Sequence, residues 1–155
     1  MENEKFYKNT KGIPQNKIVT RFMKMNVIPK KAIDLGCGAG RDTVYLIKNG
    51  WTVLAIDKVD TEKIISSQLS PEEKIKFRFE KQEFENIKLE PNNLLIASFS
   101  IPFCAKEHFQ EFWKRITNSI IKDRILCWKS FWTKWWMEKQ RRNNIFKQRK
   151  SVRIV

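Results

Sequence analysis

The run from Lys30 to Lys58, KKAIDLGCGAGRDTVYLIKNGWTVLAIDK, constrains the fold more than any other part of this 155-residue chain. A short apolar strand at Ala32–Leu35 leads into a glycine-rich loop and then into a helix at Arg41–Lys48. A second strand follows at Trp51–Ile56, and Asp57 comes directly after it. A strand–helix–strand unit of this length predicts two parallel strands joined by a right-handed crossover.

The glycine loop, residues 36–40, points to a bound nucleoside cofactor. Its glycines, Gly36, Gly38 and Gly40, let the backbone turn sharply and approach a ligand with no Cβ in the way. A dinucleotide fingerprint would place its third glycine at position 41, where this chain has Arg41, so the spacing disfavours NAD. Asp57 stands 19 residues after Gly38, where a carboxylate can accept hydrogen bonds from both ribose hydroxyls.

The rest of the chain up to residue 121 continues the alternation of helices and strands. The expected elements are a helix at Pro14–Met25, a helix at Asp60–Gln68, a strand at Ile75–Phe79, a polar loop at Glu80–Asn93, a strand at Leu94–Phe99 and an amphipathic helix at Lys106–Ile121. The inward face of the last helix is predicted to comprise Phe109, Phe112, Trp113, Ile116 and Ile120. This order predicts an α/β fold, a Rossmann-like parallel sheet with helices on both faces.

The motif DLGCGAGR followed by NGWTVLAIDK resembles the class I methyltransferases that use S-adenosylmethionine (SAM), and in particular their tellurite-resistance branch. The resemblance covers residues 5–121. It implies that S-adenosylmethionine is the cofactor, that Asp34 and the glycine loop hold its methionine part, and that Asp57 holds its ribose. Arg41 and Lys58 match positions that flank the cofactor in this family.

The resemblance also implies roles for residues after the third and fourth strands. Glu83 matches an acidic residue that reaches the adenine amine, with Phe84 under the ring, although a solvated loop carboxylate is the alternative for Glu83. Ser98 or Phe99 would lie near the sulfonium. The expected cofactor-binding residues are Asp34, Gly36, Cys37, Gly38, Gly40, Arg41, Asp57, Lys58, Glu83, Phe84 and Ser98. Within this set, Cys37 has packing as a simpler role.

No residue is assigned to catalysis, and the expected activity does not require one. Methyl transfer is an in-line displacement that depends mainly on alignment, so a soft nucleophile needs no general base. His108, the single histidine, is expected at the surface or at a helix cap, and Cys104 in the core. Tyr7 either closes over the cofactor or packs. The expected function is transfer of a methyl group to a small molecule, with a chalcogen oxyanion, a thiol and a hydroxyl left open as acceptors.

The last part of the chain has a different composition. Residues 122–155 carry 11 basic and 2 acidic side chains, four of the six Trp and no glycine, whereas residues 1–121 have a net charge of +5. A class I sheet has seven strands, but the apolar spacing after residue 121 predicts no strand. We therefore expect a SAM-binding methyltransferase domain at 1–121 in which strands five to seven are missing. Residues 122–155 are expected to form a basic tail that is not natively folded.

A frameshift near Lys122–Arg124 explains this tail. Tryptophan has the single codon TGG, and read one base later every TGG begins a glycine codon, so the four Trp of the tail would become Gly. The chain would then be a catalytically inactive SAM-binding remnant or a damaged enzyme. An alternative is a genuine tail that binds nucleic acid, with cations contacting phosphates and Trp stacking on bases.

The cysteine content and the lengths of the apolar stretches indicate in which cellular compartment the protein is expected. Three widely spaced cysteines, Cys37, Cys104 and Cys127, suit neither a disulfide framework nor a zinc site, so no metal is expected. No apolar stretch approaches the roughly 20 residues of a membrane span, and the polar N-terminus lacks the apolar core of a signal peptide. A cytoplasmic protein with a small-molecule substrate and no membrane partner is expected, with its oligomeric state left open.

Overall fold

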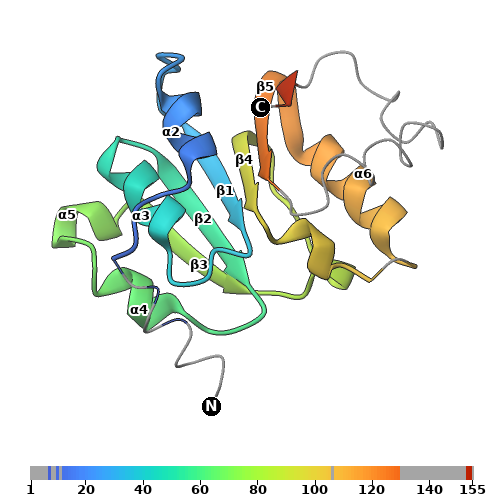
Figure 1. The fold of residues 1–155 in the computed structure, drawn as a ribbon, viewed down its shortest axis with the longest axis horizontal. Helices are drawn as coiled ribbons and strands as arrows, with labels where there is room; N and C mark the ends of the chain where they lie inside the picture. Colours follow the sequence, from blue (N-terminus) through green and yellow to red (C-terminus); the bar gives the residue numbers. More distant parts are fainter. Residues whose placement is uncertain (1–6, 8–9, 11, 106, 130–152, 155) are drawn as a thin grey trace.

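The computed structural model describes residues 7, 10, 12–105, 107–129 and 153–154. They form a parallel sheet with strand order β3-β2-β1-β4-β5-β6, and helices lie on both sides of it (Figure 1). The strands are β1 (Lys31–Leu35), β2 (Thr52–Asp57), β3 (Phe77–Lys81), β4 (Asn92–Ser98), β5 (Ile120–Lys129) and β6 (Arg153–Ile154). The α-helices are α2 (Lys17–Met23), α3 (Arg41–Lys48), α4 (Glu62–Ser66), α5 (Pro71–Lys74) and α6 (Phe109–Ser119), and two 3₁₀ turns are η1 (Phe84–Asn86) and η2 (Ile101–Phe103).

The central strands are buried on both faces, and alternate side chains enter two separate cores. On β1, Ala32 belongs to one core and Ile33 to the other. The Ile33 core is covered by α6, whose Phe112 and Ile116 are buried against the sheet. The Ala32 core is covered by α2, α3 and α4, with Trp51 fully buried among them. The predicted Rossmann-like α/β fold is therefore confirmed, because a parallel sheet needs helices over both faces.

Three predicted helices are shorter than expected, and one of them, expected at Asp60–Gln68, spans only Glu62–Ser66. The first helix begins at Lys17 instead of Pro14, because the side chain of Asn16 caps it by accepting a hydrogen bond from the backbone N–H of Ile18. The helix expected at Lys106–Ile121 ends at Ser119. Ile120 is buried as expected, but it begins β5 instead of extending the helix.

The strand β5 corrects the prediction that the fifth strand is missing. Residues 120–129 run parallel to β4, with Leu95 opposite Leu126 and Ser98 opposite Lys129. Leu126 is fully buried. Residues 125–128, ILCW, form an uncharged run, which is what a strand with neighbours on both sides requires. β4 therefore has a partner on each side instead of the unpaired edge that the prediction implied.

The tail hypothesis itself remains a prediction. The boundary expected between residues 121 and 122 falls inside β5, and most of the tail, residues 130–152 and 155, lies outside the described residues. In the described part of the chain, none of the helices has the length and apolar character needed to cross a membrane.

Candidate functional site

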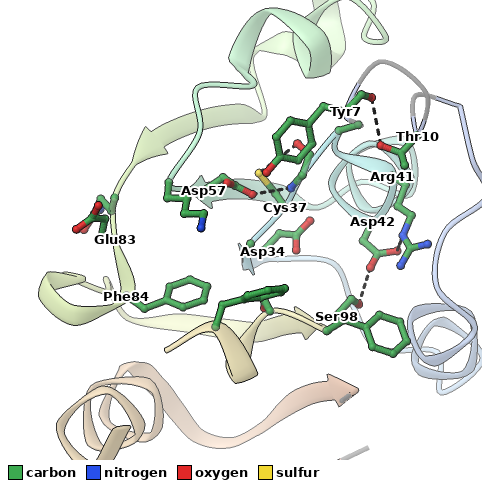
Figure 2. A pocket seen from close by; sticks show the side chains of 18 of the residues that line it. Tyr7, Thr10, Asp34, Cys37, Arg41, Asp42, Asp57, Glu83, Phe84 and Ser98 are labelled. Carbon is green, nitrogen blue, oxygen red and sulfur yellow. Dashed lines mark hydrogen bonds and ion pairs between the residues drawn. The ribbon is translucent and has the colours of Figure 1, made fainter. Parts of the chain in front are cut away.

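The carboxyl ends of β1, β2 and β4 meet at one edge of the sheet, where a cavity of about 680 Å³ opens. β1 pairs with β2 on one side and with β4 on the other. The chain therefore extends the sheet in one direction from β1 through β3 and in the opposite direction from β4 onward. In open α/β sheets ligands bind in the crevice at such a switch point. The residues that line the cavity come from the loops after these strands, from the N-terminal segment and from the turn after β3 (Figure 2).

The glycine loop between β1 and α3 needs glycine for two reasons. Gly36, Gly38 and Gly40 all have positive φ values, 68°, 56° and 81°, which side-chain-bearing residues rarely adopt. In addition, a Cβ on Gly36 would lie 2.3 Å from Cβ of Ser100, and one on Gly40 would lie 2.5 Å from Cγ1 of Ile65. The loop is therefore wedged between the turn after β4 and helix α4.

Asp57, at the end of β2, closes the glycine loop from the other side. Its Oδ2 accepts a hydrogen bond of 2.9 Å from the backbone N–H of Gly38, and its Oδ1 accepts one of 3.0 Å from the backbone N–H of Val59. The side chain is nearly buried, yet it lines the cavity. Each carboxylate oxygen keeps a lone pair beyond the backbone bond, so the group can still accept hydrogen bonds from a ligand.

Asp34, the last-but-one residue of β1, is a buried carboxyl in the cavity wall. Its Oδ2 accepts a hydrogen bond of 2.7 Å from the hydroxyl of Thr43 on α3. Burial, together with the nearby Asp42 carboxylate, raises the pKa of Asp34 to about 7. A cationic ligand beside Asp34 would favour the charged form of this carboxyl group.

Asp42 was not predicted as a site residue, and it connects three elements at the cavity. It lies in the first turn of α3 and is 3% exposed. Its Oδ1 accepts a 2.6 Å hydrogen bond from the backbone N–H of Asn16, and its Oδ2 accepts a 2.7 Å hydrogen bond from the hydroxyl of Ser98. Nε of Arg41 lies 3.9 Å from Oδ1. There was little reason in the sequence to choose Asp42, because an acidic residue in a first helical turn usually only complements the helix dipole. The one sequence signal for a site role was its position four residues before Leu46, which places it on the buried face of α3.

The N-terminal segment contributes Tyr7 to the same cavity. Its ring lies 3.5 Å from the position that a Cβ on Gly38 would occupy. Burial, together with the neighbouring Asp57 carboxylate, raises the pKa of Tyr7 to about 12. The side chain therefore stays a neutral phenol beside the glycine loop. Both roles expected for Tyr7, closing over the cofactor and packing, stay predictions.

Cys37 and Cys104 are buried free thiols. Burial raises the pKa of Cys37 well above its ordinary value, and the Asp34 carboxylate adds to this effect. Burial likewise raises the pKa of Cys104 to about 11. Thiols with raised pKa values are poor nucleophiles, so both positions are better explained by packing.

The remaining predicted residues lie around the mouth of the cavity. Phe84 stacks on Phe112 of α6 with ring centroids 5.0 Å apart, while Glu83 is exposed beside it. Nζ of Lys58 lies 6.0 Å from the ring centroid of Phe103, which is 76% exposed. All the predicted cofactor-binding residues except Gly40 line the cavity, as does Phe99; Gly40 packs on Ile65 instead. His108 is the exposed residue before α6 and does not line it.

Several solved structures of methyltransferases share this fold. TehB from Haemophilus influenzae is 21% identical with a TM-score of 0.62, over 77% of this chain and 42% of that chain. A TehB-like SAM-dependent methyltransferase from Corynebacterium glutamicum is 17% identical with a TM-score of 0.62, and the match covers 77% of this chain and 67% of that chain. The 1,6-didemethyltoxoflavin-N1-methyltransferase of Burkholderia thailandensis, solved with S-adenosylhomocysteine, is 19% identical with a TM-score of 0.62. This match covers 70% of this chain and 48% of that chain.

The match to a protein family is more extensive. No curated protein matches the chain. The chain spans about half the length of several of the solved methyltransferases that it matches. The model of the tellurite resistance protein TehB family matches residues 1–119, which is most of the chain and includes every described residue of the cavity. This chain therefore belongs to the TehB family of tellurite resistance proteins.

Proposed function

We propose that this protein binds S-adenosylmethionine in the cavity at the carboxyl edge of the sheet and transfers its methyl group to a small molecule. The observation that carries the proposal is the joint position of the glycine loop and Asp57, which the Gly38–Asp57 hydrogen bond of 2.9 Å holds together at the switch point of the sheet. When bound, the cofactor supplies a methyl group activated by a sulfonium, so the protein mainly has to bind and align the two reactants.

The residues of the cavity fit this cofactor. Its volume of about 680 Å³ lies in the range of ligand pockets. The hydroxyl Oγ of Ser100 is buried in the wall with no hydrogen-bond partner, as expected of a group that a ligand would satisfy. Asp34 would face the cationic methionine part, Asp57 the ribose hydroxyls, and Glu83 with Phe84 the adenine. These four assignments rest on the family and on their positions around one cavity.

Asp57→Ala tests the cofactor site directly. Loss of a carboxylate that accepts ribose hydroxyls is expected to weaken S-adenosylmethionine binding about 10- to 100-fold, measured by isothermal titration calorimetry. Asp57→Asn keeps the side-chain volume and is expected to show a weaker defect in the same direction. Asp60→Ala is the matched control, because Asp60 is an exposed carboxylate nearby that caps the backbone N–H of Glu62 outside the cavity. Equal binding by wild type and both Asp57 variants would contradict the proposal.

A SAM-binding remnant without turnover is the second candidate. It is favoured by the composition of the tail, which holds 11 basic side chains, four Trp and no glycine. Binding of the cofactor with no transfer to any acceptor would favour it. The cytoplasmic location belongs to this proposal as well, and it is supported by the two buried free thiols.

A further inference from the structure

We propose that the hydroxyl of Ser100 is a further cofactor-binding group, which donates a hydrogen bond to the ring oxygen of the cofactor's ribose. This inference rests on the proposed function and adds one contact at the same site. Ser100 follows strand β4 and was not among the expected cofactor-binding residues. The same hydroxyl should lower the stability of the ligand-free protein, which makes its role measurable in two independent ways.

An unpaired polar atom carries the argument. Oγ of Ser100 is buried and has no hydrogen-bond partner among the described residues, although a buried hydroxyl normally has one. Two other buried side-chain atoms in the described part of the chain share this condition, Nε1 of Trp51 and Oδ1 of Asn92, but neither residue lines the cavity. Ser100 does line it. Its hydroxyl is therefore the unpaired group that a ligand in this cavity can satisfy.

Local structure leaves this hydroxyl available and holds the side chain in place. Ser100 is the residue before the 3₁₀ turn η2, where a serine commonly accepts a hydrogen bond from a backbone N–H, yet its side chain makes no such bond. It packs directly against Gly36, since a Cβ on Gly36 would lie 2.3 Å from Cβ of Ser100 and 3.2 Å from its Oγ. Cζ of Phe84 lies 3.5 Å from the same position. Ser100 thus meets the glycine loop at the point that the Phe84 ring also reaches.

The order of the strands indicates which part of the cofactor Ser100 meets. β1 lies between β2 and β4, and Asp34 near the end of β1 lies between Asp57 and Ser98 (Figure 2). In the proposed site Asp57, at the end of β2, accepts hydrogen bonds from the ribose hydroxyls. A ribose carries its two hydroxyls on one edge and its ring oxygen on the opposite edge. With the hydroxyl edge toward β2, the ring oxygen faces the residues that follow β4, and Ser100 is one of them.

The hydrogen-bonding chemistry of the two partners matches. The ribose ring oxygen has lone pairs and no hydrogen, so it can only accept a hydrogen bond. Its partner must therefore be a donor. The hydroxyl of Ser98, at the end of β4, already donates its proton to Oδ2 of Asp42 at 2.7 Å. The Ser100 hydroxyl has its proton uncommitted and can supply the bond.

The same hydroxyl should destabilise the protein when no ligand is bound. A buried hydroxyl without a partner loses its hydrogen bonds to water on folding and gains none in return. Replacement by alanine removes this cost, so Ser100→Ala should be more stable than wild type in the absence of ligand. A hydroxyl with a merely structural role would act in the opposite direction, because its removal would break a bond within the protein.

The test measures binding of two ligands to the full-length chain by isothermal titration calorimetry. The ligands are S-adenosylhomocysteine and its carbocyclic analogue, in which a methylene group replaces the ribose ring oxygen. Wild type should bind S-adenosylhomocysteine about 5-fold more tightly than the analogue, the scale of one hydrogen bond. In Ser100→Ala the dissociation constant of S-adenosylhomocysteine should rise about 5-fold, whereas that of the analogue should stay within about twofold of its wild-type value. Urea denaturation without ligand should place the midpoint of Ser100→Ala at a higher urea concentration than that of wild type.

Ser119→Ala is the matched control. Ser119 is a buried serine outside the cavity, and its Oγ donates to the backbone oxygen of Ile116 at 2.8 Å and accepts from the side-chain amide of Asn92 at 3.1 Å. Its removal should lower the urea midpoint and leave both dissociation constants unchanged.

Three results would overturn the inference: equal affinity of wild type for the two ligands, a Ser100→Ala effect that is the same on both, or a urea midpoint of Ser100→Ala at or below that of wild type. Failure of wild type to bind S-adenosylhomocysteine would instead defeat the proposed function, and this inference with it.

Discussion

At the scale of single residues, the two aspartates predicted for the cavity wall differ in their contacts. Asp57 accepts hydrogen bonds from two backbone N–H groups, whereas Asp34 accepts one from the hydroxyl of Thr43 and has the Asp42 carboxylate beside it. Burial, together with this like charge, raises the pKa of Asp34.

The raised pKa of Asp34 predicts a pH dependence of stability. Its pKa rises from 3.8 to about 7 on folding, so the folded protein binds a proton more tightly than the unfolded chain. The stabilising contribution of that proton is complete below about pH 4 and is lost as the pH rises to about 7. Urea unfolding at pH 5 and pH 7.5 should therefore show a loss of stability in wild type that is smaller in Asp34→Asn. An equal pH dependence in both proteins would contradict the assignment.

At the scale of elements, strand β5 completes the core on the α6 side of the sheet. β5 pairs with β4 over five consecutive positions after a register shift near Asn92, and the side-chain amide of Asn92 donates to Oγ of Ser119 at 3.1 Å. Because α6 ends at Ser119 and β5 begins at the next residue, this amide secures the sharp change from helix to strand. The fifth strand is thus tied to the fourth at the start of their pairing.

Leu126→Ala tests whether β5 belongs to the folded core. Leu126 is fully buried, so removing its side chain beyond Cβ should lower the free energy of unfolding by about 2–5 kcal/mol, measured by urea denaturation. Ile121→Ala is the control on the same strand, since Ile121 is 43% exposed and should cost about 1 kcal/mol or less. Equal, small effects at both positions would show that β5 does not dock on β4 in solution.

At the scale of the whole molecule, the cavity and the tail occupy different parts of the chain. Every described residue that lines the cavity falls between Tyr7 and Phe103. Residues 122–155 hold a net charge of +9 out of the +14 of the chain. Cofactor binding should therefore depend little on the tail, whereas stability depends on it through β5.

Replacement of residues 122–155 by the reading shifted by one base tests this separation. In a class I sheet a glycine turn precedes the fifth strand, and the shifted reading would supply such a turn, so the free energy of unfolding should rise. The dissociation constant of S-adenosylmethionine should stay within about threefold, because sites without shared contacts behave nearly independently. Calorimetry and urea denaturation on both chains measure the two effects. Binding by the replaced chain alone would show that the tail damages the cofactor site, and a gene sequence without an indel relative to close relatives would contradict the frameshift.

The sequence by itself determined the parts of this protein that depend on local pattern. The run from Lys30 to Lys58 specified β1, α3 and β2 to within one residue, because apolar strands, the glycine loop and Asn49-Gly50 each act on their own neighbourhood. The apolar stripe of α6 was predictable for the same reason, whereas the strand expected at Ile75–Phe79 begins two residues later, at Phe77, and ends at Lys81. The positions of Asp34 and Asp57 at the cavity also followed, since parallel strands share one carboxyl edge.

Only the tertiary structure decided which distant residues meet. Asp42 and Ser98 are 56 positions apart, and their contact depends on β4 pairing next to β1, which no local pattern encodes. The requirement for glycine at 36 likewise comes from the approach of Ser100 across the sheet edge. β5 was missed because its apolar residues show no clear alternation; the partner offered by β4 makes that run a strand. Strand order brings these groups together, and strand order is set by burial across the whole sheet.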